Sequence, residues 1–224
     1  MTFSISARCA DTGMFGIAVS SSSPCVAARC AHARAGAGVV ASQNITDPRL
    51  GPKGLDLMQS GLSAPEALKR LKADAPHLQH RQLALVDVRG GTASFSGQGT
   101  LGTHAIVEAP DVVAAGNLLA NEGVPERMID HFRGSAGRPL GDRLLGAMRA
   151  ALDAGGEAGS VHSAGMLLVR DVPWPIADLR VDWSEDPIGE IERLWQRWQP
   201  EMEAYVSRAL NPSEAPSYGV AGDP

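Results

Sequence analysis

The densest group of side chains able to do chemistry is His77, His80, Arg81 and Gln82. His80 could act as an acid, or it could bind a substrate carboxylate together with Arg81, whose planar guanidinium matches that group. The spacing of the two histidines also permits metal ligation from a helix, but no third ligand is evident, and we expect no metal. Cations placed against the dipole at the end of a helix explain the same group, and this structural interpretation is favoured.

Two further groups look like functional motifs but lack the required context. Gly97, Gly99 and Gly102 are not surrounded by a strand–helix–strand unit, so they do not predict a dinucleotide site. The acidic residues between Asp178 and Asp186 alternate with Arg180, which favours a structural ion-pair network over paired acid and base carboxylates. We therefore expect no cofactor.

The elements that must position these side chains follow from the spacing of apolar residues. Strands are expected at residues 3–7, 15–19, 39–41, 83–86, 92–95, 105–107, 112–115, 164–170 and 176–182. Helical patterns are expected at residues 55–61, 63–71, 125–154 and 188–209. Because strands and helices occur in separate blocks, the predicted fold class is α+β. We expect two facing antiparallel sheets flanked by helices, in a four-layer αββα sandwich.

Local signals support several of these boundaries. Ser63 and Glu66 have the spacing of a capping box, which predicts the start of a helix. Gly90-Gly91 separates two expected strands and predicts a hairpin. Asp11, Thr12 and Gly13 supply turn residues between the first two strands.

The last helix carries an apolar stripe with alternating three- and four-residue spacing. Its members are Ile188, Ile191, Trp195, Trp198, Met202, Tyr205 and Ala209. The stripe is typical of a helix packed on its own domain. The alternative is a contact between subunits, and we expect a homo-oligomer that uses Trp195 and Trp198. Pro200 should kink or restart the helix. The chain is predicted to form one domain over residues 1–210, followed by a disordered tail over 211–224.

Composition excludes several classes of function. The formal charge of −5 leaves no basic face for nucleic acid. No apolar run approaches the roughly 20 residues needed to span a bilayer, and the N-terminus lacks the pattern of a signal peptide. Cys9, Cys25 and Cys30 form an odd set without metal-site spacing, which indicates reduced thiols. We expect a cytoplasmic protein with neither a nucleic-acid nor a membrane partner.

Many short motifs, in order along residues 2–195, resemble the family called domain of unknown function 1028, which is grouped with the N-terminal-nucleophile hydrolases. The matching stretches are residues 2–5, 16–20, 33–36, Gln43, 51–55, 61–63, 80–82, 116–119, 163–164, 178–182 and 186–188. The resemblance implies an N-terminal-nucleophile-hydrolase-like fold. The family has no agreed reaction, so it implies the activity only through that grouping.

The grouping makes Thr2 the candidate nucleophile. In this class the hydroxyl of the first residue attacks a carbonyl, and its own α-amino group takes the proton. An α-amine has a pKa of about 8, which suits a base near neutral pH. Aminopeptidases remove Met1 readily before a residue as small as Thr. The alternative is that Thr2 merely opens a strand.

The other candidate site residues are polar side chains near strand ends. Asn117 is the candidate donor to the oxyanion, with a turn asparagine as the alternative. The candidate substrate-binding residues are Ser20, Gln43, His80, Arg81 and Ser163. The expected substrate is an amide in a small peptide-like, cyclic or acylated nitrogen compound. The competing hypotheses are a non-catalytic protein that binds an anionic small molecule through Arg34 or Arg81, and an oligomeric assembly protein on the same fold.

Overall fold

Ten strands form two antiparallel sheets in the computed structural model, which describes residues 1–222. The six-stranded sheet has the order β10-β9-β2-β1-β8-β7 and contains β1 (Thr2–Arg8), β2 (Phe15–Ser21), β7 (Ala105–Ala109), β8 (Val112–Asn117), β9 (Ser163–Val169) and β10 (Ala177–Val181). The four-stranded sheet has the order β3-β4-β5-β6 and contains β3 (Ala31–Arg34), β4 (Gly38–Asn44), β5 (Arg81–Asp87) and β6 (Thr92–Ser96). The predicted α+β class with two antiparallel sheets is confirmed.

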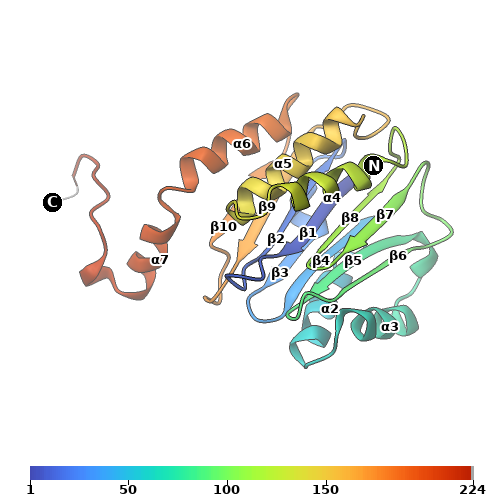
Figure 1. Cartoon of the computed structure of the whole chain (residues 1–224), viewed down its shortest axis with the longest axis horizontal. Helices are drawn as coiled ribbons and strands as arrows, with labels where there is room; N and C mark the ends of the chain where they lie inside the picture. The colour runs from blue at the N-terminus through green and yellow to red at the C-terminus, as the bar shows by residue number, and fades with distance from the viewer. Residues whose placement is uncertain (223–224) are drawn as a thin grey trace.

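Helices pack on the outer face of each sheet (Figure 1). The helices of the chain are α1 (Ala27–Cys30), α2 (Leu50–Gln59), α3 (Ala64–Asp74), α4 (Val124–Gly134), α5 (Leu140–Asp153), α6 (Pro187–Trp198) and α7 (Met202–Leu210), with 3-10 turns at Leu78–His80 and Pro212–Glu214. α2 and α3 cover the four-stranded sheet, whereas α4 and α5 cover the six-stranded one. Within residues 1–222, no helix is both long and apolar enough to cross a membrane.

The central strand β1 has one apolar and one polar face. Phe3 and Ile5 are fully buried in the core that includes α4 and α5. Because side chains alternate along a strand, Thr2, Ser4 and Ser6 point the other way, toward the four-stranded sheet. The strand pattern therefore directs a row of hydroxyl groups into the space between the sheets.

An apolar core fills most of the space between the two sheets. Its buried members are Phe15, Ile17, Val39, Ala41, Ala84, Val86, Val113, Ala115 and Val169. Its residues come from β2, β8 and β9 on one side and from β4 and β5 on the other. The polar row of β1 is thus embedded in an apolar layer, which isolates its hydroxyl groups from bulk solvent.

Local signals located several elements correctly, and long patterns were less precise. The capping box is confirmed, because the backbone N–H of Ser63 donates to Glu66 at 2.8 Å. The hairpin of β5 and β6 is also confirmed. Residues 125–154 form two helices rather than one continuous pattern, since Gly137 has a φ of 84° in the connection between them. The short strand β3 was not predicted.

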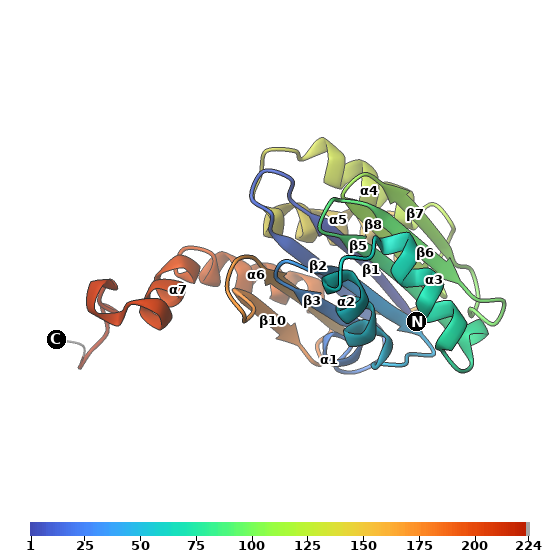
Figure 2. The same cartoon turned by 90° about the horizontal axis from the view of Figure 1, so that it is seen from below.

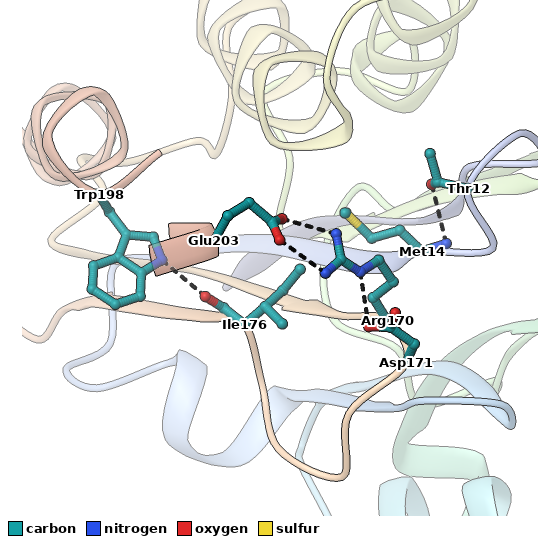
Figure 3. Close-up of polar contacts among 7 residues, drawn as sticks. All are labelled: Thr12, Met14, Arg170, Asp171, Ile176, Trp198 and Glu203. Atoms are coloured by element: carbon teal, nitrogen blue, oxygen red, sulfur yellow. Dashed lines mark hydrogen bonds and ion pairs between the residues drawn. The ribbon is translucent and has the colours of Figure 1, made fainter. Parts of the chain in front are cut away.

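The predicted last helix is divided into α6 and α7 around Pro200, as its position indicated. Trp195 is buried, and its indole N–H donates to Asp142 at 2.7 Å. Figure 3 shows the Trp198 indole N–H donating to the Ile176 carbonyl at 2.9 Å. It also shows Arg170 paired with Glu203 of α7, at 2.8 and 3.1 Å. The two tryptophans of the stripe thus have partners within the chain, whereas Tyr205 and Ala209 are exposed, and the homo-oligomer stays a prediction.

The segment from α7 onward extends away from the two sheets (Figures 1 and 2). Tyr218 still contacts the chain, since its ring lies 3.9 Å from the guanidinium carbon of Arg208. Residues 223–224 of the predicted tail lie outside the described residues. The limits of the predicted domain and tail stay predictions.

Asp87 fastens the end of β5 to the start of α3. Its carboxylate accepts hydrogen bonds from the backbone N–H groups of Ala64 at 2.8 Å, Arg89 at 2.8 Å and Gly91 at 3.0 Å. Asp87→Ala leaves these donors without their acceptor. We expect the free energy of unfolding, measured with urea, to be lower than that of the wild type by about 2 kcal/mol. Asp74→Ala, which removes an exposed carboxylate paired with Lys53, is the control and should change it by less than about 1 kcal/mol. Equal losses in the two variants would contradict this role for Asp87.

Candidate active site

Thr2 lies at the start of β1 with only 4% of its surface exposed. It stands opposite Asn117 of β8 in the antiparallel register. The Thr2 hydroxyl donates to the carbonyl of Met1, and the Ser21 hydroxyl donates to the same oxygen at 2.5 Å. The peptide bond before Thr2 therefore lies between two hydroxyl groups from neighbouring strands.

A chain of amide side chains links this end of β1 to the opposite sheet. Ser4 donates to Gln43 Oε1 at 2.7 Å, and Gln43 Nε2 donates to Gln82 Oε1 at 2.8 Å. Asn117 Nδ2 donates to the same Gln82 oxygen at 3.1 Å. Gln82 Nε2 completes the chain by donating to the carbonyl of Gly116 at 3.0 Å. These bonds tie β1, β4 and β8 to Gln82 of β5 and hold Asn117 at a fixed place between the sheets. Thr2 is placed there by its pairing with Asn117.

The Asn117 side chain retains hydrogen-bonding groups that could bind a ligand. Its Oδ1 is buried and has no hydrogen-bond partner among the described residues. A buried acceptor without a donor costs about 1–3 kcal/mol, so such atoms are uncommon outside functional sites. With Nδ2 bonded to Gln82, the amide can accept one hydrogen bond and still has one N–H to donate.

Glu157 is a member of the site that the sequence did not reveal. Only 4% of its surface is exposed, and its carboxylate accepts from the backbone N–H of Ser22 at 3.2 and 3.3 Å. Burial raises the pKa of Glu157 to about 7, against the opposing effects of the N-terminal ammonium and the Ser22 hydrogen bond. Glu157 follows Gly155-Gly156 in a connection without periodicity, so no sequence pattern distinguished it from a solvated loop carboxylate.

The two candidate serines lie near Thr2 but have other partners. Ser20 is paired with Phe3, so it lies on the face of the sheet opposite to Thr2, and its hydroxyl donates to the Ser163 carbonyl at 2.9 Å. Ser163 shares the face of Ser21. The Ser163 hydroxyl donates to Ser23 at 2.6 Å and accepts from the Val26 N–H at 3.2 Å. Ser163 thereby fastens the loop after β2, and Ser21 is the serine that contacts the Met1–Thr2 peptide.

His80 and Arg81 lie at the rim of the four-stranded sheet. His80 is exposed, and its carbonyl accepts from Asn44 Nδ2 at 2.7 Å. The Arg81 guanidinium donates to the carbonyl of Ile45. Of this sequence cluster, Gln82 is the residue that the fold brings to Asn117. Within residues 1–222, no three His, Cys, Asp or Glu side chains are grouped so that they could hold a metal ion.

A cavity of about 360 Å³ lies at the other end of β1 and is separate from this site. It is lined by residues of the β1–β2 turn, the start of α5 and the junction of α6 and α7, including Cys9, Met14, Arg143, Trp195 and Met202. Thr2 is at the opposite end of the strand, so this cavity does not lead to its hydroxyl.

Gln82 is expected to hold the amide chain together. Gln82→Met leaves the Gln43 and Asn117 amide N–H groups and the Gly116 carbonyl without their partner in a buried region. We expect a loss of about 2 kcal/mol in the free energy of unfolding, measured with urea. Ser96→Ala removes only the outermost contact of Gln82, at 3.0 Å, and should cost less than about 1 kcal/mol. If Gln82→Met is no more harmful than Ser96→Ala, the amide chain does not stabilise the site.

Comparison with known proteins places the chain in a family. Residues 2–191 match the family described as "Family of unknown function (DUF1028)". The crystal structure of protein SPO2555 from Silicibacter pomeroyi, described as a member of DUF1028, is 30% identical, with 88% of each chain covered and a TM-score of 0.80.

Two further results complete the comparison. The Anbu (ancestral beta-subunit) protein from Yersinia bercovieri is 11% identical, with 91% of this chain and 97% of its own covered, but its TM-score of 0.39 is too low to bear on the fold. No curated protein matches the sequence. The family resemblance drawn from the motifs is confirmed over most of the sequence, and the chain belongs to the family of unknown function DUF1028.

Proposed function

We propose that this chain is an N-terminal-nucleophile amidohydrolase with an αββα sandwich fold, and that Thr2 is its nucleophile once Met1 has been removed. The observation that carries the proposal is the contact of the Thr2 and Ser21 hydroxyls with one carbonyl oxygen, that of Met1. Removal of Met1 also removes this carbonyl, so it marks the place that a substrate carbonyl would take beside the Thr2 oxygen, with Ser21 as a hydrogen-bond donor to its oxygen. The layer order of helices, sheet, sheet and helices supports the fold assignment.

In the proposed reaction the Thr2 hydroxyl oxygen bonds to the carbonyl carbon of an amide. Its proton passes to the free α-amino group of Thr2 and then to the departing nitrogen as the C–N bond breaks. Ser21 and the remaining Asn117 N–H are the candidate donors to the oxyanion. Water then hydrolyses the Thr2 ester and releases the acid. The proposed substrates are small peptide-like, cyclic or acylated nitrogen compounds.

The surroundings of Arg34 favour this proposal over an anion-binding protein. Arg34 donates to Asp56 at 2.7 Å and to Gln59 at 2.6 Å, so its guanidinium group has partners within the chain. Arg81 donates to a backbone carbonyl at the sheet rim, but its Nε, like Asn117 Oδ1, is buried without a partner among the described residues. Arg34 therefore carries the argument against the anion-binding alternative.

The test is the intact mass of the purified protein before and after exposure to a β-lactone. The expected protein is lighter by one methionine and gains one adduct. The adduct carries the whole mass of the lactone, because ring opening releases no atoms. Peptide mapping should locate the adduct at Thr2. Retained Met1 together with no adduct would contradict the proposal and leave a binding or assembly protein on this fold.

A further inference from the structure

Glu157 is a buried carboxylate that a distant part of the chain brings to the start of β1. Its backbone pairs with Leu119, just beyond β8, and its carboxylate accepts from the Ser22 N–H, just beyond β2. These are the two strands that flank β1. Glu157 is therefore fixed from both sides of the strand on which Thr2 lies.

In this structure the ammonium of the chain is that of Met1, which is exposed, and its positive charge acts on the Glu157 carboxylate. Removal of Met1 would transfer the ammonium to Thr2, the first residue of β1. The field of the ammonium and the Ser22 hydrogen bond lower the pKa of Glu157, against the larger effect of burial. The loop after β8 contributes the apolar Leu119, and the β2 end contributes Ser21 and Ser22, which do not titrate. Asp153, at the end of α5, is another carboxylate on a neighbouring element, but it is exposed to solvent.

One other buried titratable group faces the N-terminus. Burial raises the pKa of the Cys30 thiol, which a hydrogen bond from Thr46 and the charges of Arg29 and the N-terminal ammonium partly oppose. An uncharged thiol does not neutralise an ammonium. Glu157 is thus the carboxylate available to the chain's amino end among the groups that the structure describes there.

We propose that, once Met1 has been removed, Glu157 and the α-amino group of Thr2 form an acid–base pair in which the carboxylate orients the amine and stabilises its protonated form. The catalytic consequence rests on the proposed function, since it applies when the amine of Thr2 takes up the hydroxyl proton. Glu157 then acts as a positioning residue: it keeps its own charge while the ammonium forms beside it. A preorganised charge of this kind stabilises the transition state without moving.

The pair can be tested without any catalytic turnover. The probe is acetic anhydride at limiting concentration, and mass spectrometry measures the acetylation rate of the chain's α-amine between pH 5 and 9. Glu157→Gln should accelerate acetylation at pH 7 by about threefold to tenfold, because more of the amine is neutral when the carboxylate is lost. Glu157→Asp should lie between the two. Glu122→Gln, an exposed carboxylate beyond β8, is the matched control and should equal the wild type.

A second readout connects the pair to the reaction. The rate of β-lactone addition to Thr2 should fall at low pH in every variant, because the α-amine that takes the proton becomes protonated. In the wild type, protonation of Glu157 below about pH 7 adds to this fall. Glu157→Gln should lower the rate about tenfold or more at pH 8 and should lack the added fall.

The outcomes separate the two proposals. Acetylation that changes in Glu157→Gln, without a Thr2 adduct in any variant, would support the pair and contradict the hydrolase. Equal acetylation rates in the wild type, Glu157→Gln and Glu122→Gln would overturn the pair, whatever Thr2 does. Should Glu157→Gln fail to fold, Glu157→Asp decides on the same rates.

Discussion

Thr2→Ala is expected to slow addition of a β-lactone to the chain by ~10³-fold or more, because the variant lacks the attacking oxygen. Any residual addition would come from attack by another nucleophilic side chain, such as the free thiol of Cys9 or Cys25. The measurement is the time course of the intact mass, with the processed N-terminus verified in the same spectrum. This is the largest effect that the proposed function predicts.

Matched variants separate loss of the hydroxyl from loss of packing. Thr2→Val keeps the shape of the buried side chain and removes its hydroxyl, which costs about 1 kcal/mol for the lost hydrogen bond, so the variant should fold and still give no adduct. Thr2→Ser restores a hydroxyl and should recover the adduct. If Thr2→Ala and Thr2→Val react at the wild-type rate, another side chain is the nucleophile and the assignment of Thr2 is wrong.

Glu157→Gln is expected to increase the free energy of unfolding by about 3 kcal/mol at pH 8 and to leave it nearly unchanged at pH 4. Burial raises the pKa of Glu157 from its ordinary 4.5 to about 7, so the folded chain holds this proton more tightly than the unfolded chain. The contribution of Glu157 to the free energy of unfolding is therefore greatest below pH 4.5 and is lost as the pH rises to about 7. Each pKa unit corresponds to about 1.4 kcal/mol.

Urea unfolding of the wild type, Glu157→Gln and Glu122→Gln at both pH values measures this effect. The gain should appear only at pH 8 and only in Glu157→Gln, because glutamine still accepts the Ser22 hydrogen bond but never carries the charge. A buried charge that lowers stability is typical of residues retained for function. The same gain at pH 4 would mean that the carboxylate is not the source of the cost.

The features of the fold that the sequence predicted correctly depend on interactions between residues close together in the chain. The alternation of Phe3, Ser4 and Ile5 fixes two faces of a strand wherever that strand lies. Ser63 and Glu66 cap a helix through contacts only three residues apart. The sequence did not reveal that residues 125–154 form two helices, because α4 and α5 share one apolar periodicity and are separated by the turn at Gly137.

The candidate site shows where sequence reasoning stops. Asn117 and Gln43 could be selected as polar residues near strand ends, and Thr2 through the family grouping and its place after Met1. The structure links Asn117 and Gln43 through Gln82, and it pairs Thr2 with Asn117. Ser20 was selected instead of Ser21, and a difference of one residue changes the face of the strand. Register is a property of two paired strands, so the sequence of β2 alone could not decide between them.

The sequence by itself determined the α+β class, the pattern of strand faces and the position of a small hydroxyl residue directly after Met1, since each depends on neighbours within a few residues. The tertiary structure alone decided that Gln82 links Asn117 to Gln43 and that the Glu157 carboxylate accepts from the Ser22 N–H, just beyond β2. Both contacts join segments far apart in the chain. These contacts depend on how the two sheets pack and on which loops lie near β1. The periodicity of the sequence therefore could not predict them.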